Sequence, residues 1–338
     1  MLIIRPIKAE DLDILEEFAR SSSLGMTSMP RKRSLLEKKI EHSLEAFESD
    51  ISFPERETYL FVLEDSETNE VGGSCGIYSK TGVNDPLYYF KIEILNQVSD
   101  LPIPDELRVL HPVSYRNGPT EMCGLFLSKE FRQGGLGRLL SLSRFLFIAS
   151  HPHRFDTTVM AQLRGVIRKS TKSSPFWEHL GQHFLNLPFQ EAMAKLDYGR
   201  GFIEEFLPEY PIYASLLPHE AQRVMGATHE STKPAFKMLY NEGFRYTFEI
   251  DIFEAGPRLV ALRDEIRTIQ ECHVAKIRKI EGDEMKLGRR QLICNGRMDF
   301  RCCIGKAHQT HGEVVIDEKL AKALQVDVGD EVRYVNLH

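Results

Sequence analysis

The sequence predicts a mixed α/β (α+β) protein with a small β-rich domain at its C-terminal end. Three observations predict this class. The chain has 338 residues, enough for about two domains of ordinary size. Strand-like and helix-like hydrophobic spacings alternate over the first two thirds of the chain. From about Cys272 onward, only short strand-like runs occur, separated by Gly and Asp turn signals.

The N-terminal elements follow from this spacing. Residues 2–7 (LIIRPI) predict a first strand, and residues 8–22 and 34–47 carry apolar side chains at helical intervals. Two apolar runs, 59–65 and 71–80, flank a Ser-Glu-Thr-Asn turn and predict an antiparallel hairpin. A Pro-rich region with little periodicity follows, and it predicts a loop from Ser99 to Pro119.

The central segment predicts strand, helix and strand in succession. Residues 121–127 are strand-like, a glycine-rich turn follows, and residues 138–150 have the broad apolar face of a buried helix. Residues 156–167 (DTTVMAQLRGVI) predict the next strand. The C-terminal runs around QLICNGR, FRCCIGKA, EVVIDEKLAKAL and VGDEVRYVNL predict a small, barrel-like β domain.

Charge and composition exclude several classes of protein. The chain has 43 basic and 49 acidic residues, a net charge of −6, so we expect no nucleic-acid partner. No apolar run approaches the roughly 20 residues of a membrane span, so we expect no membrane partner. Arg5 and the acidic residues after it come too early for a signal peptide, and we expect a cytoplasmic protein. The six scattered cysteines predict reduced, structural thiols.

A glycine-rich turn joins the central strand to the helix after it. Backbone N–H groups at a helix N-terminus bind anions, and glycines let phosphate oxygens approach them closely. Flanking arginines add charge-assisted contacts. A plain glycine turn is the alternative, but the context favours a pyrophosphate site. The predicted cofactor-binding residues of this turn are Arg132, Gln133, Gly134, Gly135, Leu136, Gly137 and Arg138.

The turn is neither a P-loop nor a dinucleotide-binding fingerprint, because the Lys-Ser/Thr pair and the ribose-binding acid are missing. Its pattern, Arg132, Gly135 and Gly137, resembles the coenzyme A pyrophosphate loop of the GNAT acyltransferases. Further segments resemble the arginine N-succinyltransferase family in order along the chain: MTSMP, VLEDSET, NDPLY, LFLSKEFRQGGLGRLLSLSRFLFIA, LRGV, SPFWEHLG, FLPEYPIY, THESTKPAFKMLYNEGF and IDIFEAGP. The β-rich tail also resembles the end of that family.

The resemblance implies a GNAT-like fold and transfer of a succinyl group from succinyl-CoA to the α-amino group of L-arginine. Succinyl-CoA is then a co-substrate, and no permanently bound cofactor is implied. The strand at Leu125, Phe126 and Leu127 is expected to lie beside the pantetheine arm, with a backbone N–H polarising the thioester carbonyl. His229, in the word THESTKPAFKML, falls where the family has its proton donor.

Other candidate residues are less specific. Arg144 or Arg164 could pair with the succinyl carboxylate, and Asp85 or Asp251 with the arginine guanidinium, although local ion pairs explain them as well. Two groups have incomplete zinc-like spacing, and we predict no metal at either: His179 with His183, and Cys302, Cys303, His308 and His311.

Two similar segments, SPFWEHLGQHF and KPAFKMLYNEGF, suggest two related GNAT-like halves. The predicted units are 1–190 with the acyl-CoA site, 191–270 with His229, and the β-rich domain 271–338. We expect a homo-oligomer or pairing with a paralogous subunit.

The chain departs from the family pattern at Leu87, Lys91 and Glu230. Arg and Lys are not interchangeable at a carboxylate site, so acceptor choice is the weakest inherited feature. Ornithine or another amine as acceptor, acetyl-CoA as donor, and a non-catalytic acyl-CoA or arginine sensor are the alternatives.

Overall fold

The computed structural model describes residues 1–22, 28–97, 100, 105–282, 288–310 and 312–337; Met26 and Thr27 of the MTSMP segment lie outside these ranges. The first elements are β1 (Leu2–Pro6), α1 (Leu12–Ser21), α2 (Arg33–Glu48), β2 (Thr58–Asp65) and β3 (Val71–Tyr78). Strands β2 and β3 pair antiparallel, which confirms the predicted hairpin. Side chains alternate along β2, so Leu60 and Val62 pack against α1 and α2 while Tyr59 and Phe61 face the main core.

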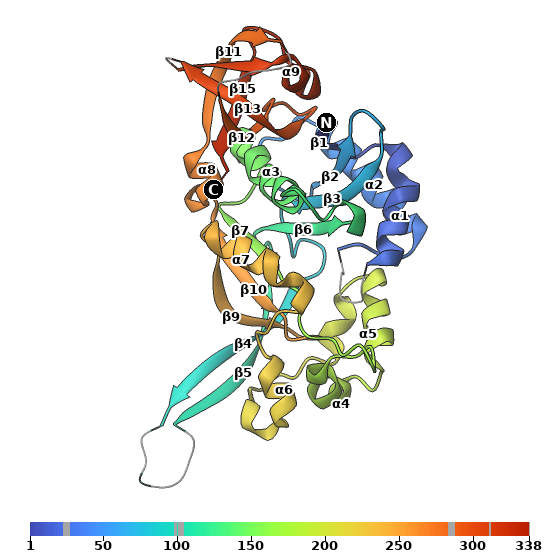
Figure 1. Ribbon diagram of the computed structural model, residues 1–338. Coiled ribbons are helices and arrows are strands. Elements are labelled where there is room, and N and C mark those ends of the chain that lie inside the picture. The colour runs from blue at the N-terminus through green and yellow to red at the C-terminus, as the bar shows by residue number, and fades with distance from the viewer. Residues whose placement is uncertain (23–27, 98–99, 101–104, 283–287, 311, 338) are drawn as a thin grey trace.

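A long two-stranded arm comes next. β4 (Leu87–Asn96) and β5 (Glu106–Tyr115) pair antiparallel over their whole length and project from the body of the molecule (Figure 1). The predicted loop over 99–119 is therefore wrong where β5 lies. Most residues of β5 are exposed or half-buried, so burial on one face does not impose the apolar alternation that marks a strand in sequence.

The central strand, helix and strand are confirmed as β6 (Thr120–Leu127), α3 (Leu136–Ser150) and β7 (Thr158–Gln162). β6 and β7 run parallel, as a connection through a helix requires. α3 is buried along nearly its whole length. It packs on the face of the sheet opposite α1 and α2 and also contacts the C-terminal strands (Figure 1).

The segment after β7 covers the base of the arm before the chain returns to the sheet. It contains α4 (Gln182–Phe184), α5 (Phe189–Lys195), β8 (Ile212–Tyr213), α6 (His219–Val224) and α7 (Lys233–Asn241). Trp177, Phe176 and Phe189 anchor its own apolar cluster. The chain continues through β9 (Arg245–Asp251), β10 (Pro257–Leu262) and α8 (Arg267–Glu271), where β10 pairs with β7 and β9 pairs with β10 and β4.

The boundary predicted near residue 190 falls inside α5, and strands from both sides of it belong to one sheet. The strand order from β1 to the arm is β1-β2-β3-β6-β7-β10-β9-β4-β5-β8. The units 1–190 and 191–270 thus share one sheet rather than each having its own.

The C-terminal strands close into a barrel. They are β11 (His273–Glu281), β12 (Arg289–Cys294), β13 (Cys302–Thr310), β14 (Glu313–Asp317) and β15 (Glu331–Asn336). Pairing runs β12-β15-β11-β14-β13 and returns to β12, so the predicted β-rich C-terminal region is confirmed and its strands pair in a closed ring. The segment EVVIDEKLAKAL is a strand followed by α9 (Glu318–Leu324) rather than a strand throughout. β13 also pairs with β1, which links the barrel to the rest of the sheet.

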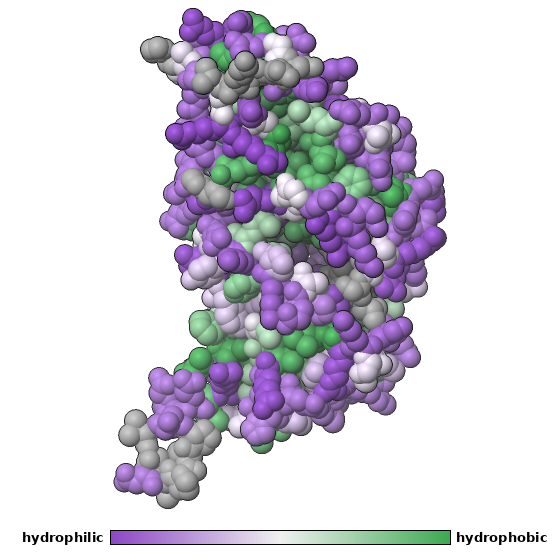
Figure 2. All heavy atoms as spheres, in the orientation of Figure 1, coloured by the Kyte–Doolittle hydropathy of each residue, from purple (hydrophilic) through white to green (hydrophobic). Residues whose placement is uncertain are grey.

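Hydrophobic residues reach the surface in separate areas of the face shown in Figure 2, one beside the barrel and another at the base of the arm. Within the described ranges, no helix is both long and apolar enough to cross a membrane.

Candidate active site

The parallel strands β6 and β7 separate part-way along their length. They pair only at Thr120 with Val159 and at Glu121 with Met160. β6 then continues to Leu127, and within the described residues no further pairing joins it to β7. Beyond Glu121, this edge of β6 pairs with no strand in the described structure, and an extended ligand can pair with it as a strand would. We call this stretch without strand pairing the β6–β7 opening.

A β-bulge lies at the same level of β6. Ser74 pairs with Phe126 and Gly76 with Cys123, so Cys75 of β3 stands opposite two residues, Gly124 and Leu125. Gly124 has φ +60°, which favours glycine, and its N–H donates to Ser28 Oγ at 3.1 Å. The bulge bends β6 at Leu125, and the family resemblance implies that the N–H of Leu125 or Phe126 polarises the donor carbonyl.

The predicted pyrophosphate turn lies at the end of β6 and opens α3. Gly134 and Gly135 have φ of +62° and +85°, and a Cβ on either would meet no atom within 4 Å. The amides of Gly134, Gly135 and Gly137 donate to no acceptor in the described part of the chain. Arg132 ties the turn to β6, since its Nε donates to Leu127 O at 3.0 Å.

These features make the turn suitable for an anion. Three backbone N–H groups, the positive end of a 15-residue helix and exposed Arg132 and Arg138 meet at an open surface. Gln133 is also exposed, whereas Leu136 is buried as the first apolar anchor of α3. The structure thus brings the predicted turn residues together at the mouth of the β6–β7 opening.

His229 lies beside the end of β7. Its backbone N–H donates to Arg164 O at 2.9 Å, two residues beyond β7. Its ring Nδ1 accepts from Ser231 N at 3.2 Å and lies 2.7 Å from Ser231 Oγ. Because Nδ1 is an acceptor, the neutral ring carries its hydrogen on Nε2, which has no partner among the described residues. Burial and the charges of Arg164 and Lys169 lower the pKa of His229, so the neutral form prevails at pH 7.

The two predicted arginines lie in different environments. Arg144, on α3, is 3 % exposed, and its guanidinium donates to the carbonyl oxygens of Gly76 and Cys123, the strand pair at one end of the bulge. These hydrogen bonds link β3 and β6 next to the bulge, from the side of the sheet that α3 covers. Arg164 is half-buried next to His229, and burial lowers the pKa of its guanidinium while Glu254 raises it.

The two predicted aspartates each bind backbone. Asp85 Oδ2 accepts from Arg200 N at 2.6 Å. Asp251 Oδ1 accepts from Phe253 N at 2.8 Å and from Glu254 N at 2.9 Å, which fixes the β9–β10 turn. Burial raises the pKa of Asp251. In both residues the second carboxylate oxygen has no hydrogen-bond partner among the described residues.

Sequence reasoning missed Glu121 and Arg200. Glu121 is the last β6 residue paired with β7, and burial raises the pKa of its carboxyl group while Arg200, Lys39 and Arg258 lower it. A lone acid inside the apolar run TEMCGLFL was the signal that could have identified Glu121. Arg200 had no comparable signal, because its position depends on a contact with Asp85 that lies 115 residues away.

A buried acid also lies at the end of β7. Glu254 is 5 % exposed, and its Oε1 accepts from Gly165 N at 3.0 Å while Oε2 has no partner in the described structure. Burial and neighbouring Asp251 raise its pKa to about 8. Glu254 is therefore largely protonated at neutral pH, which lowers the cost of burying it.

The residues with zinc-like spacing have other contacts. His179 Nε2 lies 2.5 Å from Glu220 Oε1 in an ion-pair network with Arg168. Cys302 and Cys303 are buried in the barrel strands, and His311 lies outside the described residues. All six cysteines are free. No metal-binding cluster occurs among the residues that the structure describes.

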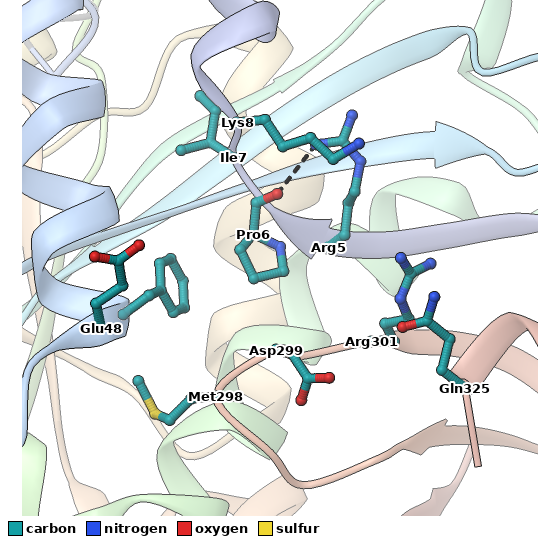
Figure 3. Close-up of a pocket in the computed structure, with 10 residues that line it drawn as sticks. Arg5, Pro6, Ile7, Lys8, Glu48, Met298, Asp299, Arg301 and Gln325 are labelled. Atoms are coloured by element: carbon teal, nitrogen blue, oxygen red, sulfur yellow. Dashed lines mark hydrogen bonds between the residues drawn. The ribbon is translucent and has the colours of Figure 1, made fainter.

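A separate cavity of about 310 Å³ lies between β1 and the barrel (Figure 3). Arg5, Lys8 and Arg301 line it together with Glu48 and Asp299. None of the predicted site residues borders this cavity, so the β6–β7 opening remains the candidate site.

The turn offers backbone N–H groups to a phosphate-bearing group, and the edge of β6 without a partner strand offers backbone groups to an extended arm. An acyl group at the end of that arm would lie near the bulge. These features agree with the acyltransferase that the sequence resemblance implies, one that takes its acyl group from a CoA thioester.

Comparison with known proteins identifies the family. The sequence profile of the arginine N-succinyltransferase beta subunit matches residues 2–268, and the profile of its C-terminal domain matches residues 273–336. Arginine N-succinyltransferases of Salmonella paratyphi B and Salmonella enteritidis are 36% identical to the chain over 343 residues, covering all of it and 98% of each relative. The chain belongs to the arginine N-succinyltransferase family and is an acyltransferase, as predicted.

A solved structure supports the same assignment through its fold. Subunit AI of the arginine/ornithine succinyltransferase from Pseudomonas aeruginosa superposes with a TM-score of 0.87 at 33% identity, covering 99% of this chain and 98% of that subunit. The predicted acyltransferase fold class with a β-rich C-terminal region is thereby confirmed.

Proposed function

We propose that this protein transfers the succinyl group of succinyl-CoA to the α-amino group of L-arginine, giving N2-succinylarginine and CoA. The observation that carries the proposal is the separation of β6 from β7 between the glycine turn and His229. Membership of the arginine N-succinyltransferase family supports the donor and acceptor.

The donor is proposed to bind along β6. Its pyrophosphate accepts hydrogen bonds from the amides of the turn, with Arg132 and Arg138 adding charge. The pantetheine arm then passes Leu127 and Phe126, and the thioester carbonyl accepts from the Leu125 amide at the bulge. Such a preorganised donor stabilises the negative charge that develops on the carbonyl oxygen during attack.

The acceptor amine attacks the thioester carbon directly, so binding both reactants in one site supplies much of the catalysis. The C–N bond forms and the C–S bond breaks. The imidazolium form of His229 donates its Nε2 proton to the departing sulfur and becomes the neutral ring, and the proton released from the new amide nitrogen restores the imidazolium. The amine must first lose its ammonium proton to solvent or a nearby base.

A thiol-release assay tests this proposal. Wild-type protein with succinyl-CoA should release CoA only when L-arginine is present, and mass spectrometry should identify N2-succinylarginine. Ornithine and acetyl-CoA in competing reactions test the alternative acceptor and donor. Binding of succinyl-CoA without arginine-dependent release would contradict the proposal and favour a sensor.

We also propose a cytoplasmic enzyme that acts as a homo-oligomer or with a paralogous subunit. The Pseudomonas aeruginosa relative is described as a subunit, which supports an assembly. Light scattering of the purified chain tests it, and a monomer mass at micromolar concentration would contradict the homo-oligomer.

A further inference from the structure

Two opposite charges, Glu121 and Arg200, lie near the point where β6 and β7 separate. Both side chains are half-buried. The Glu121 carboxylate and the Arg200 guanidinium each lack a hydrogen-bond partner among the described residues. Their charges act on each other, yet no ion pair within 4 Å joins them in the described structure. Packing places both groups in one neighbourhood. Met160, the residue paired with Glu121, packs against Leu87 and Tyr89 of β4, and Asp85, two residues before Leu87, accepts the hydrogen bond from Arg200 N.

Glu121 is fixed by the sheet itself. It pairs with Tyr78 of β3 on one side and Met160 of β7 on the other, and directly opposed side chains lie on the same face. Lys39 of α2 hydrogen-bonds to Tyr78 Oη on this face, and Tyr89 Oη lies 3.9 Å from Met160 Sδ. On this face Glu121 therefore has the aromatic and apolar side chains of Tyr78 and Met160 and the Lys39 ammonium as neighbours, and it lies two residues before Cys123 and the bulge.

The position of Arg200 is fixed by a turn built around Asp85, which lies two residues before Leu87, a residue that packs against Met160. Gly199 has φ +112°, and a Cβ there would lie 2.8 Å from Asp85 Oδ2. The same oxygen accepts from Arg200 N. Only glycine at 199 lets the backbone close over the carboxylate, so Asp85 acts as a positioning residue for Arg200. The Arg200 charge also acts on Tyr89 and Asp251.

We propose that Glu121 and Arg200 bind the two α-substituents of an amino-acid acceptor, Glu121 the α-ammonium and Arg200 the α-carboxylate. This inference rests on the proposed function and names the acceptor class as an α-amino acid. A zwitterion places its two charges on one carbon, so it can contact both side chains at once. An amine without a carboxylate, or an acid without an ammonium, leaves one of the two half-buried charges without a partner.

The position of Glu121 on β6 also suits attack of the amine on the thioester. The α-amino group would lie beside Glu121, on the strand that presents the Leu125 amide to the thioester. The side chain of the amino acid then extends away from the reacting atoms, so this pair sets the orientation of the acceptor rather than the choice of its side chain.

The test uses Glu121→Gln and Arg200→Gln in the full-length protein. Glu93→Gln, in an exposed contact with His111, and Arg278→Gln, exposed on the barrel, are matched controls. Two analogues separate the roles: arginine amide lacks the carboxylate, and the 2-hydroxy analogue of arginine lacks the ammonium. Steady-state kinetics give KM and kcat, inhibition by the hydroxy analogue gives Ki, and calorimetry gives the Kd of CoA.

We expect each variant to raise the KM for arginine by about 10- to 100-fold. Arg200→Gln should abolish the preference for arginine over arginine amide. It should also raise the Ki of the hydroxy analogue. Glu121→Gln should preserve that preference and leave the Ki of the hydroxy analogue within about twofold of wild type. The Kd of CoA and the melting temperature should stay at wild-type values, as in both controls.

Unchanged KM for arginine in both variants, or equal weakening of both analogues, would overturn the inference. If the wild-type protein released no CoA with arginine, the proposed function would fail instead. Calorimetric titration of L-ornithine into the wild-type and variant proteins would still decide whether this pair binds an amino acid, and equal affinities would refute it.

Discussion

Replacing Gly135 by Val should weaken CoA binding by at least about 100-fold without unfolding the protein. Gly135 has φ +85°, a conformation that costs a non-glycine residue about 1–3 kcal/mol. A Cβ there meets nothing within 4 Å, so no clash adds to this strain. At about 2 °C per kcal/mol for a chain of this size, the melting temperature should fall by about 2–6 °C. The branched side chain would occupy the space where phosphate oxygens reach the amides of the turn.

Gly312 provides a matched control. It has φ +83°, also has nothing within 4 Å of a Cβ, and lies in the barrel. Gly312→Val should lose the same stability and keep wild-type CoA affinity. Gly135→Val should lose two charge-assisted hydrogen bonds to the phosphates, each worth about 1.5–3 kcal/mol. Calorimetry should therefore give a Kd of CoA at least about 100-fold higher than that of wild type. Equal CoA affinity in the two variants would refute the assignment of the turn.

Two further substitutions test the neighbourhood of β7. His229→Gln should lower kcat by about 10²- to 10⁴-fold and leave the Kd of CoA unchanged, because the ring acts on the departing sulfur and not on the phosphates. A wild-type kcat in this variant would show that His229 does not transfer the proton. Glu254→Gln should remove a pH dependence of stability: the folded pKa of about 8 exceeds the ordinary 4.5, so the wild type loses about 1.4 kcal/mol per pH unit between these values. The melting temperature of Glu254→Gln should therefore exceed that of wild type by a margin that grows from pH 5 to pH 8, and a constant difference would contradict the raised pKa.

Local features of the site could be predicted from the sequence. Glycines 134 and 135 before an apolar helix specify a turn with positive φ, whatever the rest of the fold does. His229 was predicted as the proton donor from the family resemblance of its surroundings, since a single histidine has no distinctive spacing. Its place beside Arg164 then follows from a backbone hydrogen bond that the sequence does not reveal.

Features set by long-range pairing could not be predicted. β5 was taken for a loop because its exposed residues lack alternation. Arg144 was a candidate for binding the succinyl carboxylate, but the structure buries it under the bulge, where two carbonyl groups accept its hydrogen bonds. Glu121 and Arg200 come from segments 79 residues apart, and only the folded sheet and the Asp85 contact bring them together.

The central claim is that donor and acceptor meet where β6 and β7 separate. A structure of the protein with CoA and N2-succinylarginine tests it most directly. The account predicts the pyrophosphate on the amides of Gly134, Gly135 and Gly137, the CoA sulfur between the Leu125 amide and His229 Nε2, and the pantetheine arm between the two strands. CoA bound elsewhere, as in the cavity between β1 and the barrel, with the β6–β7 opening empty, would contradict it.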